Sequence, residues 1–66
     1  MNRLKAYRAL KNLSQAEVAK ALGIAKSTYC NKELGNRKFT LGEVEKLSEL
    51  LGYSIEEIFF KKDVLK

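Results

Sequence analysis

Residues 14–35 read SQAEVAKALGIAKSTYCNKELG, and this pattern predicts two short helices joined by a sharp turn at Gly23. Glycine adopts a positive φ at low steric cost, so the chain can reverse direction abruptly at this residue. The first of the two helices carries small side chains at Ala16, Ala19 and Ala21, which allow another helix to approach it closely. The segment therefore fixes both the spacing and the angle between two consecutive helices.

The size of the chain leaves room for one domain, because 66 residues lie near the lower limit for folding alone. Hydrophobic residues make up 45% of the sequence, there is no proline, and only four residues are glycine. This composition favours helices throughout. We expect an all-α fold, a compact five-helix bundle that includes a helix-turn-helix. It should form a single domain over residues 1–66, with a core at about residues 3–60 and a frayed tail at 61–66.

Three capping boxes mark helix starts, since each places a hydroxyl at the start and a glutamate three residues later. They are Ser14 with Glu17, Thr40 with Glu43, and Ser54 with Glu57. Three helices are expected to end at glycines, namely Gly23, Gly35 and Gly52. The first helix is expected to end at Asn12, in the left-handed conformation. The predicted helices cover residues 2–11, 15–22, 26–34, 41–51 and 55–60.

Charge is distributed unevenly along the chain. Thirteen lysines and arginines against eight acidic residues give a net charge of +5. Residues 1–38 carry nine basic and two acidic side chains, whereas residues 39–66 carry four basic and six acidic ones. The first part of the chain is suited to attract phosphate. The alternative is an ordinary charged surface that keeps the protein in solution.

Several classes of function are excluded by residue types that the sequence lacks. The single cysteine, Cys30, has no partner for an internal disulfide, and the absence of histidine leaves no metal-ligand cluster. No nucleophile–base pair is visible, so we expect neither an enzyme nor a cofactor, and no small-molecule ligand is evident. No apolar run approaches the length of a membrane span, and the start of the chain has no signal-peptide pattern. We expect a cytoplasmic protein with no membrane partner.

The second helix of the segment, at residues 26–34, has one inward aromatic residue, Tyr29, and several polar positions near its start. Lys26, Ser27 and Asn31 have side chains that can meet base edges in DNA. This half of the helix is therefore a candidate reading surface. A solvated polar face of a generic helical bundle explains the same pattern equally well.

Residues 4–60 resemble the Cro and phage-repressor helix-turn-helix family, which includes regulators of the xenobiotic-response-element type and has a lambda-repressor-like domain. The matching motifs are Leu13-Ser14-Gln15, Val18-Ala19, Leu22-Gly23-Ile24, Lys26-Ser27-Thr28, Glu33-x-Gly35, and Leu51-Gly52-Tyr53-Ser54 followed by Ile58-Phe59. The resemblance implies a sequence-specific regulator that binds double-stranded DNA, with the helix at 26–34 in the major groove. A small phage or bacterial repressor fits best.

The resemblance also assigns roles to individual residues. Gln15 is implied to contact a phosphate with help from the helix dipole. The implied base contacts are Lys26, Ser27 and Asn31, with Cys30 near the groove. The implied contacts to the DNA backbone are Thr28, Asn36, Arg37 and Lys38.

Arg8 and Glu33 match positions that form an ion pair in the family, and the pair would orient the reading helix. The alternative is two separate surface charges, which contribute little. The sequence departs from the family pattern at Lys32 and Leu34. We expect Lys32 to lie along the helix at 41–51 and present its ammonium to a phosphate, and Leu34 to turn inward and supply an apolar contact.

Leu10, Leu50 and Phe60 exceed what the core of a five-helix domain needs. Leu50 and Phe60 lie in the half of the chain through which this family commonly dimerises, so they are candidates for a homodimer interface, at least on DNA. Scattered surface residues are the alternative. The competing function is a protein-interaction module, such as an antitoxin-like partner that uses the last two helices. Such a module has no need for basic residues gathered around one face.

Overall fold

The computed structural model describes residues 2–60, which form five helical elements and no strand. The elements are α1 (Asn2–Leu10), α2 (Gln15–Leu22), α3 (Lys26–Leu34), α4 (Leu41–Leu51) and η1 (Glu56–Phe60). The all-α prediction is confirmed, and the predicted bounds of α2, α3 and α4 match. The first helix ends one residue earlier than predicted, and the last element is a π-helical turn. The expected tail at 61–66 lies outside the described residues.

Helix starts are fixed by reciprocal hydrogen bonds, as the capping boxes predicted. The Ser14 N–H donates to Glu17 Oε1 at 2.8 Å, and the Glu17 N–H donates to Ser14 Oγ at 3.0 Å. Thr40 and Glu43 form the same pair at the start of α4, and a third pair precedes η1. Each box satisfies two backbone donors that a helix start leaves free.

Left-handed residues end the helices where the sequence predicted them. Gly23 follows α2 with a φ of 76°, and its N–H donates back to the carbonyls of the last turn. Gly35 and Gly52 follow α3 and α4 with φ values of 93° and 77°. Asn12, after α1, has a φ of 57°. The turn at Gly23 sets α3 against α2.

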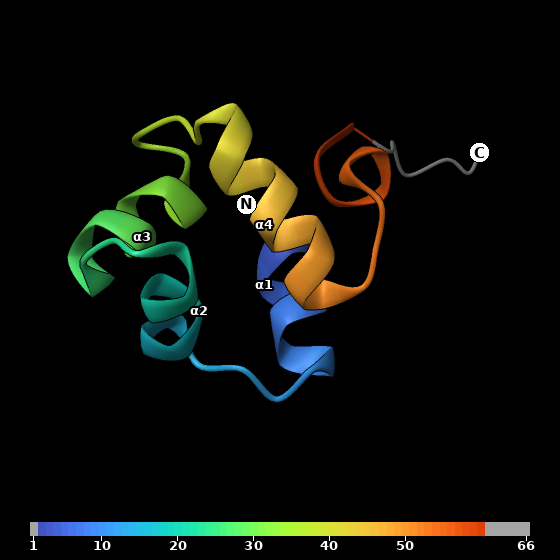
Figure 1. Ribbon diagram of the computed structural model, residues 1–66, viewed down its shortest axis with the longest axis horizontal. Helices are drawn as coiled ribbons and strands as arrows, with labels where there is room; N and C mark the ends of the chain where they lie inside the picture. Colours follow the sequence, from blue (N-terminus) through green and yellow to red (C-terminus); the bar gives the residue numbers. More distant parts are fainter. Residues whose placement is uncertain (1, 61–66) are drawn as a thin grey trace.

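The helices enclose one small core. In Figure 1, α2 and α3 pair at one end, α4 runs across the middle with α1 behind it, and η1 lies at the other end. Each fully buried valine, leucine or isoleucine side chain contributes about 1.5–3 kcal/mol by leaving water. The buried core residues are Leu4, Val18, Ala19, Leu22, Tyr29, Leu47, Leu51 and Ile58.

The prediction that Leu34 turns inward is wrong, because its side chain is 69% exposed. Leu34 continues the stripe of α3 that contains Ser27 and Asn31, at helical spacings of four and then three residues, and this stripe faces solvent. Phe39, in the loop after α3, does pack against the core. Its ring lies 6.2 Å from the Tyr29 ring and 5.6 Å from the Phe59 ring, centroid to centroid.

Candidate nucleic-acid interface

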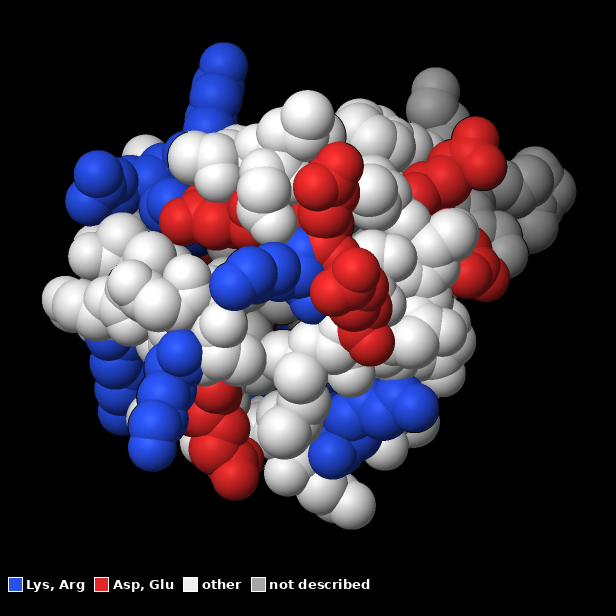
Figure 2. Space-filling model, in the orientation of Figure 1, with Lys and Arg blue, Asp and Glu red and all other residues white. Residues whose placement is uncertain are grey.

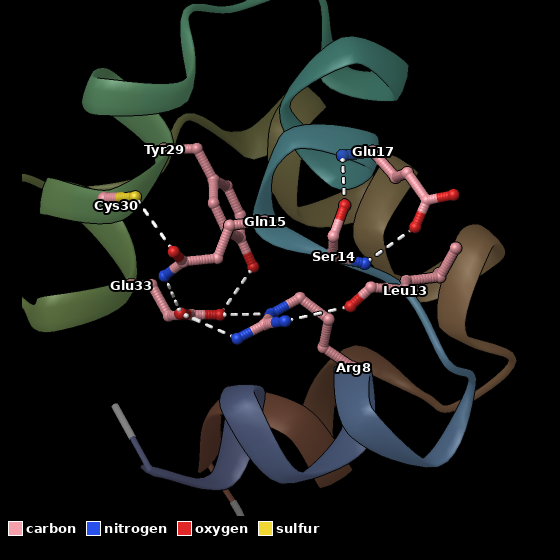
Figure 3. Close-up of polar contacts among 8 residues, drawn as sticks. All are labelled: Arg8, Leu13, Ser14, Gln15, Glu17, Tyr29, Cys30 and Glu33. Atoms are coloured by element: carbon pink, nitrogen blue, oxygen red, sulfur yellow. Dashed lines mark hydrogen bonds and ion pairs between the residues drawn. The ribbon is translucent and has the colours of Figure 1, made fainter.

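Four hydrogen bonds converge on the carboxylate of Glu33, whose side chain is 6% exposed (Figure 3). Arg8 donates from Nε at 2.9 Å and from Nη2 at 3.3 Å. Gln15 Nε2 donates at 2.7 Å, and the Tyr29 hydroxyl donates at 2.8 Å. The ion pair expected between Arg8 and Glu33 is therefore the centre of a larger network that joins α1, α2 and α3.

The network keeps Glu33 ionised. Burial opposes ionisation, but the hydrogen bonds from Arg8, Gln15 and Tyr29 outweigh it and lower the pKa of Glu33. The hydrogen bond to Glu33 raises the pKa of Arg8, against the effect of burial. Burial and the neighbouring carboxylate raise the pKa of Tyr29 far above its ordinary value. Tyr29 therefore remains a neutral hydrogen-bond donor at any physiological pH.

Arg8 also fixes the segment that leads into α2. Its Nη1 donates to the backbone carbonyl of Leu13 at 2.9 Å. One guanidinium thus connects α1 to the residue before the α2 cap and to the penultimate residue of α3. Since a guanidinium is planar and its donors are fixed in direction, this arrangement sets the orientation of α3.

Gln15 and Cys30 contact each other, although the family resemblance implied that Gln15 contacts a phosphate and that Cys30 lies near the groove. The Cys30 thiol donates to Gln15 Oε1, with 3.2 Å between sulfur and oxygen. The Gln15 amide thus bridges Cys30 and Glu33, and both Gln15 and Cys30 are half-buried. The NH2 group has two hydrogens, of which the bond to Glu33 uses one. Gln15 as a phosphate contact and Cys30 as a groove residue stay predictions.

The outer side of α3 presents the other candidate base contacts. Lys26 and Ser27 are exposed in its first turn, and Thr28 is half-buried. Asn31 is exposed too, but its Nδ2 donates to the Ser27 carbonyl at 3.1 Å, and its Oδ1 accepts from Asn36 at 3.4 Å. Its amide would have to exchange these local bonds for a base edge, whereas Lys26 and Ser27 are directly accessible.

The loop between α3 and α4 carries the remaining candidate phosphate contacts. Asn36, Arg37 and Lys38 are all exposed. The Asn36 and Arg37 N–H groups both donate to the Asn31 carbonyl, at 2.9 and 3.3 Å. The loop therefore starts directly from the last turn of the candidate reading helix.

Lys32, which was predicted to present its ammonium to a phosphate, is paired within its own chain in this structure. Lys32 is 7% exposed, and its Nζ forms an ion pair with Glu43 at 2.5 Å. The side chain does lie along the start of α4, as expected, but the charge at its end is already neutralised by a carboxylate. A buried ammonium without such a partner would be strongly destabilising.

The basic and acidic side chains lie over different helices, as their uneven distribution along the sequence suggested. In the view of Figure 2, lysines and arginines lie mostly over the end of the molecule that holds α2 and α3 in Figure 1. Acidic side chains gather along α4 and toward η1. A polyanion would therefore be drawn to the α2–α3 end.

The two dimer candidates lie in different surroundings. Phe60 is 70% exposed and lines a groove of about 610 Å³ with Leu41, Phe59 and the basic loop. Leu50 is half-buried, packs against the core, and lines a smaller hollow with Lys46. The side chains of Leu50 and Phe60 therefore line different hollows.

Residues 2–60 have neither a cluster of metal-ligand side chains nor a membrane-spanning helix. They contain no group of three or more potential metal-binding side chains. No helix in the same range has both the length and the apolar character that crossing a bilayer requires.

Sequence reasoning missed two participants in these contacts. Tyr29 was expected only as an inward aromatic residue, yet its hydroxyl donates to Glu33. Glu43 was expected only as a cap of α4, yet it also pairs with Lys32. The spacing of eleven residues between Lys32 and Glu43 crosses a loop, so no helical periodicity could have indicated the pair.

Comparison with known proteins gives a consistent result. Residues 4–58 match the model of the helix-turn-helix family. An uncharacterized HTH-type transcriptional regulator of Methanocaldococcus jannaschii is 40% identical over 62 residues, which cover 94% of each chain. The cryptic phage CTXphi transcriptional repressor RstR of Vibrio cholerae is 35% identical over 57 residues, which cover 86% of this chain and 51% of the repressor. No solved structure matches the chain significantly.

Proposed function

Since the chain belongs to the helix-turn-helix family and is a DNA-binding transcriptional regulator, we propose that it reads its operator with the first turns of α3 in the major groove. The observation that carries this proposal is the Glu33 network, which holds the inner side of α3 while Lys26 and Ser27 stay exposed on the outer side. Lysine donates to guanine, and serine pairs with several base edges. Asn31 joins them after exchanging its local hydrogen bonds.

The contacts that position the protein on the duplex come from two places beside α3. Arg37 and Lys38 in the exposed loop provide charge for phosphates, with Asn36 and Thr28 as neutral donors. Gln15 at the first turn of α2 provides the remaining N–H of its amide and the positive end of the helix dipole. Phosphate contacts of this kind set register and affinity without selecting a sequence.

Repression is the proposed direction of regulation, and the cytoplasmic nucleoid is the proposed place of action. The relative named a phage transcriptional repressor matches over 86% of this chain. A compact domain that covers its operator blocks access to the promoter without any further activity. Expression of a reporter behind the selected operator should therefore fall when the protein is supplied, and a rise would indicate an activator.

We further propose that two copies bind one operator, at half-sites about 34 Å apart on one side of the duplex. A single α3 covers too few base pairs to specify a long site. Phe60 and the apolar groove beside it, with Leu41 and Phe59, are the proposed contact between copies. Leu50 is the weaker of the two original candidates, because it already packs against the core of its own chain.

The experiment that tests the reading helix is selection of bound sites from a random DNA pool, followed by affinity measurements on every single-base variant of the best site. Lys26→Ala should change the preferred base at one position of each half-site, at a cost of about 1–3 kcal/mol on the best site. Lys46→Ala removes the same charge from an exposed position of α4 and serves as the control. If Lys26→Ala weakens all variants equally, α3 is not the reading helix.

A further inference from the structure

A lysine is buried at the end of the proposed reading helix. Lys32 is 7% exposed, and its Nζ pairs with Glu43 Oε1 at 2.5 Å and lies 5.9 Å from the centroid of the Phe39 ring. Lysine is almost never buried unless it is paired. A lysine that served only as a phosphate contact would stay in solvent, so the burial of Lys32 needs another explanation.

The carboxylate that neutralises Lys32 belongs to the α4 cap. Glu43 Oε1 accepts from the Thr40 N–H at 2.9 Å as well as from Lys32. Burial opposes ionisation, but the hydrogen bonds from Lys32 and Thr40 outweigh it and lower the pKa of Glu43. Each charge also suits its helix end, since Lys32 lies in the last turn of α3 and Glu43 in the first turn of α4. One oxygen atom thus joins the end of α3 to the beginning of α4.

This junction closes the loop that carries the proposed phosphate contacts. At the start of the loop, the Gly35 N–H donates to the Lys32 carbonyl at 3.1 Å. At its end, Thr40 is held by Glu43, and Glu43 is held by Lys32. Residue 32 therefore fixes the loop at both ends, through its backbone at one end and its side chain at the other. Arg37 and Lys38 are exposed between these two points.

We propose that Lys32 acts as a positioning residue for the phosphate-binding loop, through its ion pair with Glu43, and does not itself contact DNA. The inference rests on the proposed function, in which Arg37 and Lys38 bind phosphate. A loop that is ordered before binding avoids the entropy cost of ordering its side chains on the DNA. The pair therefore increases affinity although neither of its members touches the nucleic acid.

The two possible roles of this pair predict opposite signs for one substitution. Glu43→Gln removes a negative charge near the DNA-binding face, so electrostatics alone would strengthen binding. Glutamine also keeps a side-chain oxygen for the capping box. If the ion pair positions the loop, Glu43→Gln weakens binding despite the more positive net charge.

The test measures affinity for a fluorescent duplex carrying the selected operator, with the full chain, over a range of salt concentrations. Lys32→Met and Glu43→Gln should each weaken binding about tenfold, and the double variant should be no weaker than Lys32→Met alone. The slope of log affinity against log salt should stay unchanged in Lys32→Met, because no phosphate contact is removed. A direct contact would reduce the slope by about 0.9 for each subunit. Amide hydrogen exchange at Thr40 should be faster in both single variants.

Controls separate this inference from the proposed function. Glu45→Gln removes the same charge from an exposed position of α4 and should leave affinity unchanged or slightly higher. Arg37→Ala should weaken binding and reduce the salt slope; if it does neither, the phosphate-binding loop itself is wrong. If Arg37→Ala behaves as expected while Glu43→Gln binds as tightly as the unmodified chain, the positioning role of Lys32 is overturned. A Glu43→Gln chain that fails to fold also counts against it, since the pair would then support the whole domain.

Discussion

The network around Glu33 makes a quantitative prediction about stability. Glu33→Gln keeps the shape of the side chain but removes its charge, and an amide oxygen accepts about two hydrogen bonds where the carboxylate accepts four. The amide NH2 would also face donors from Arg8, Gln15 and Tyr29. The Arg8 guanidinium, with 12% of its side chain exposed, would keep its hydrogen bond to the Leu13 carbonyl at 2.9 Å but lose its charged partner.

The size of the effect follows from the burial of both partners. Removing one member of a buried ion pair costs about 3–5 kcal/mol, and we expect about 3 kcal/mol because glutamine still accepts part of the network. Arg8→Met should cost less, about 2 kcal/mol, because Glu33 keeps the donors from Gln15 and Tyr29. A domain of this size has a total stability of about 3–10 kcal/mol, so both losses are large.

The assay is urea unfolding followed by circular dichroism, for the two single variants and the double variant. The cost of the double change should be smaller than the sum of the single costs, by about 1–2 kcal/mol. Glu49→Gln, at an exposed position of α4, is the matched control and should unfold like the unmodified chain within about 0.5 kcal/mol. Strict additivity of Arg8→Met and Glu33→Gln would refute the network.

Acid titration of stability tests the same network independently. The folded pKa of Glu33 is lower than its ordinary value of 4.5, so its contribution is complete above about pH 4.5 and is lost as the pH falls through the folded pKa. Glu17 and Glu43 also have lowered pKa values, so their contributions to the stability of the fold are lost over the same pH range. The difference between the unmodified chain and Arg8→Met isolates Glu33, and this difference should shrink on acidification. A constant difference down to pH 2 would contradict the assignment.

Three further predictions concern the turn, the salt dependence and the assembly. Gly23→Ala should destabilise the fold by about 1 kcal/mol through its positive φ alone, since no atom lies within 4 Å of the added Cβ. Gly42→Ala, which is helical and equally unobstructed, should stabilise the fold by about 0.5–1 kcal/mol in the same urea-unfolding assay. Equal effects of the two substitutions would show that the turn at Gly23 is not strained. Operator affinity should fall roughly 10³-fold for a dimer between 50 and 200 mM salt, and a flat salt titration would argue against DNA as the main partner. Phe60→Asp should abolish cooperative binding to two half-sites in gel shifts while leaving binding to a single half-site intact, and unchanged cooperativity would exclude Phe60 from the contact.

The sequence was sufficient for most of the fold because its helix boundaries are local signals. Each capping box acts within four residues, and Gly23, Gly35 and Gly52 end helices through their own backbone conformation. These signals do not depend on packing, so they survive in the structure unchanged. The Ser54–Glu57 box marks the start of the last element in the same way, but it does not distinguish a π-helical turn from an α-helix.

The candidate site was less predictable because its contacts are tertiary. The ion pair of Arg8 with Glu33 was expected only from the family resemblance, since 25 residues separate them. Lys32 was expected to lie along α4 with its ammonium on a phosphate, and nothing in the sequence indicated that Glu43 at the start of α4 provides the carboxylate that pairs with it. Leu34 was expected to turn inward and supply an apolar contact, but its side chain is exposed, and Phe39 packs against Tyr29.

The central claim is that the outer side of α3 and the loop after it form the DNA-binding face. Its most direct test is an NMR titration of isotope-labelled protein with the selected duplex. The account predicts that the amide shifts concentrate at the start of α2, in residues 26–31 and in residues 35–38, and that they are small in α1 and η1. Shifts concentrated in η1 and the adjoining part of α4, with residues 26–31 unchanged, would contradict it.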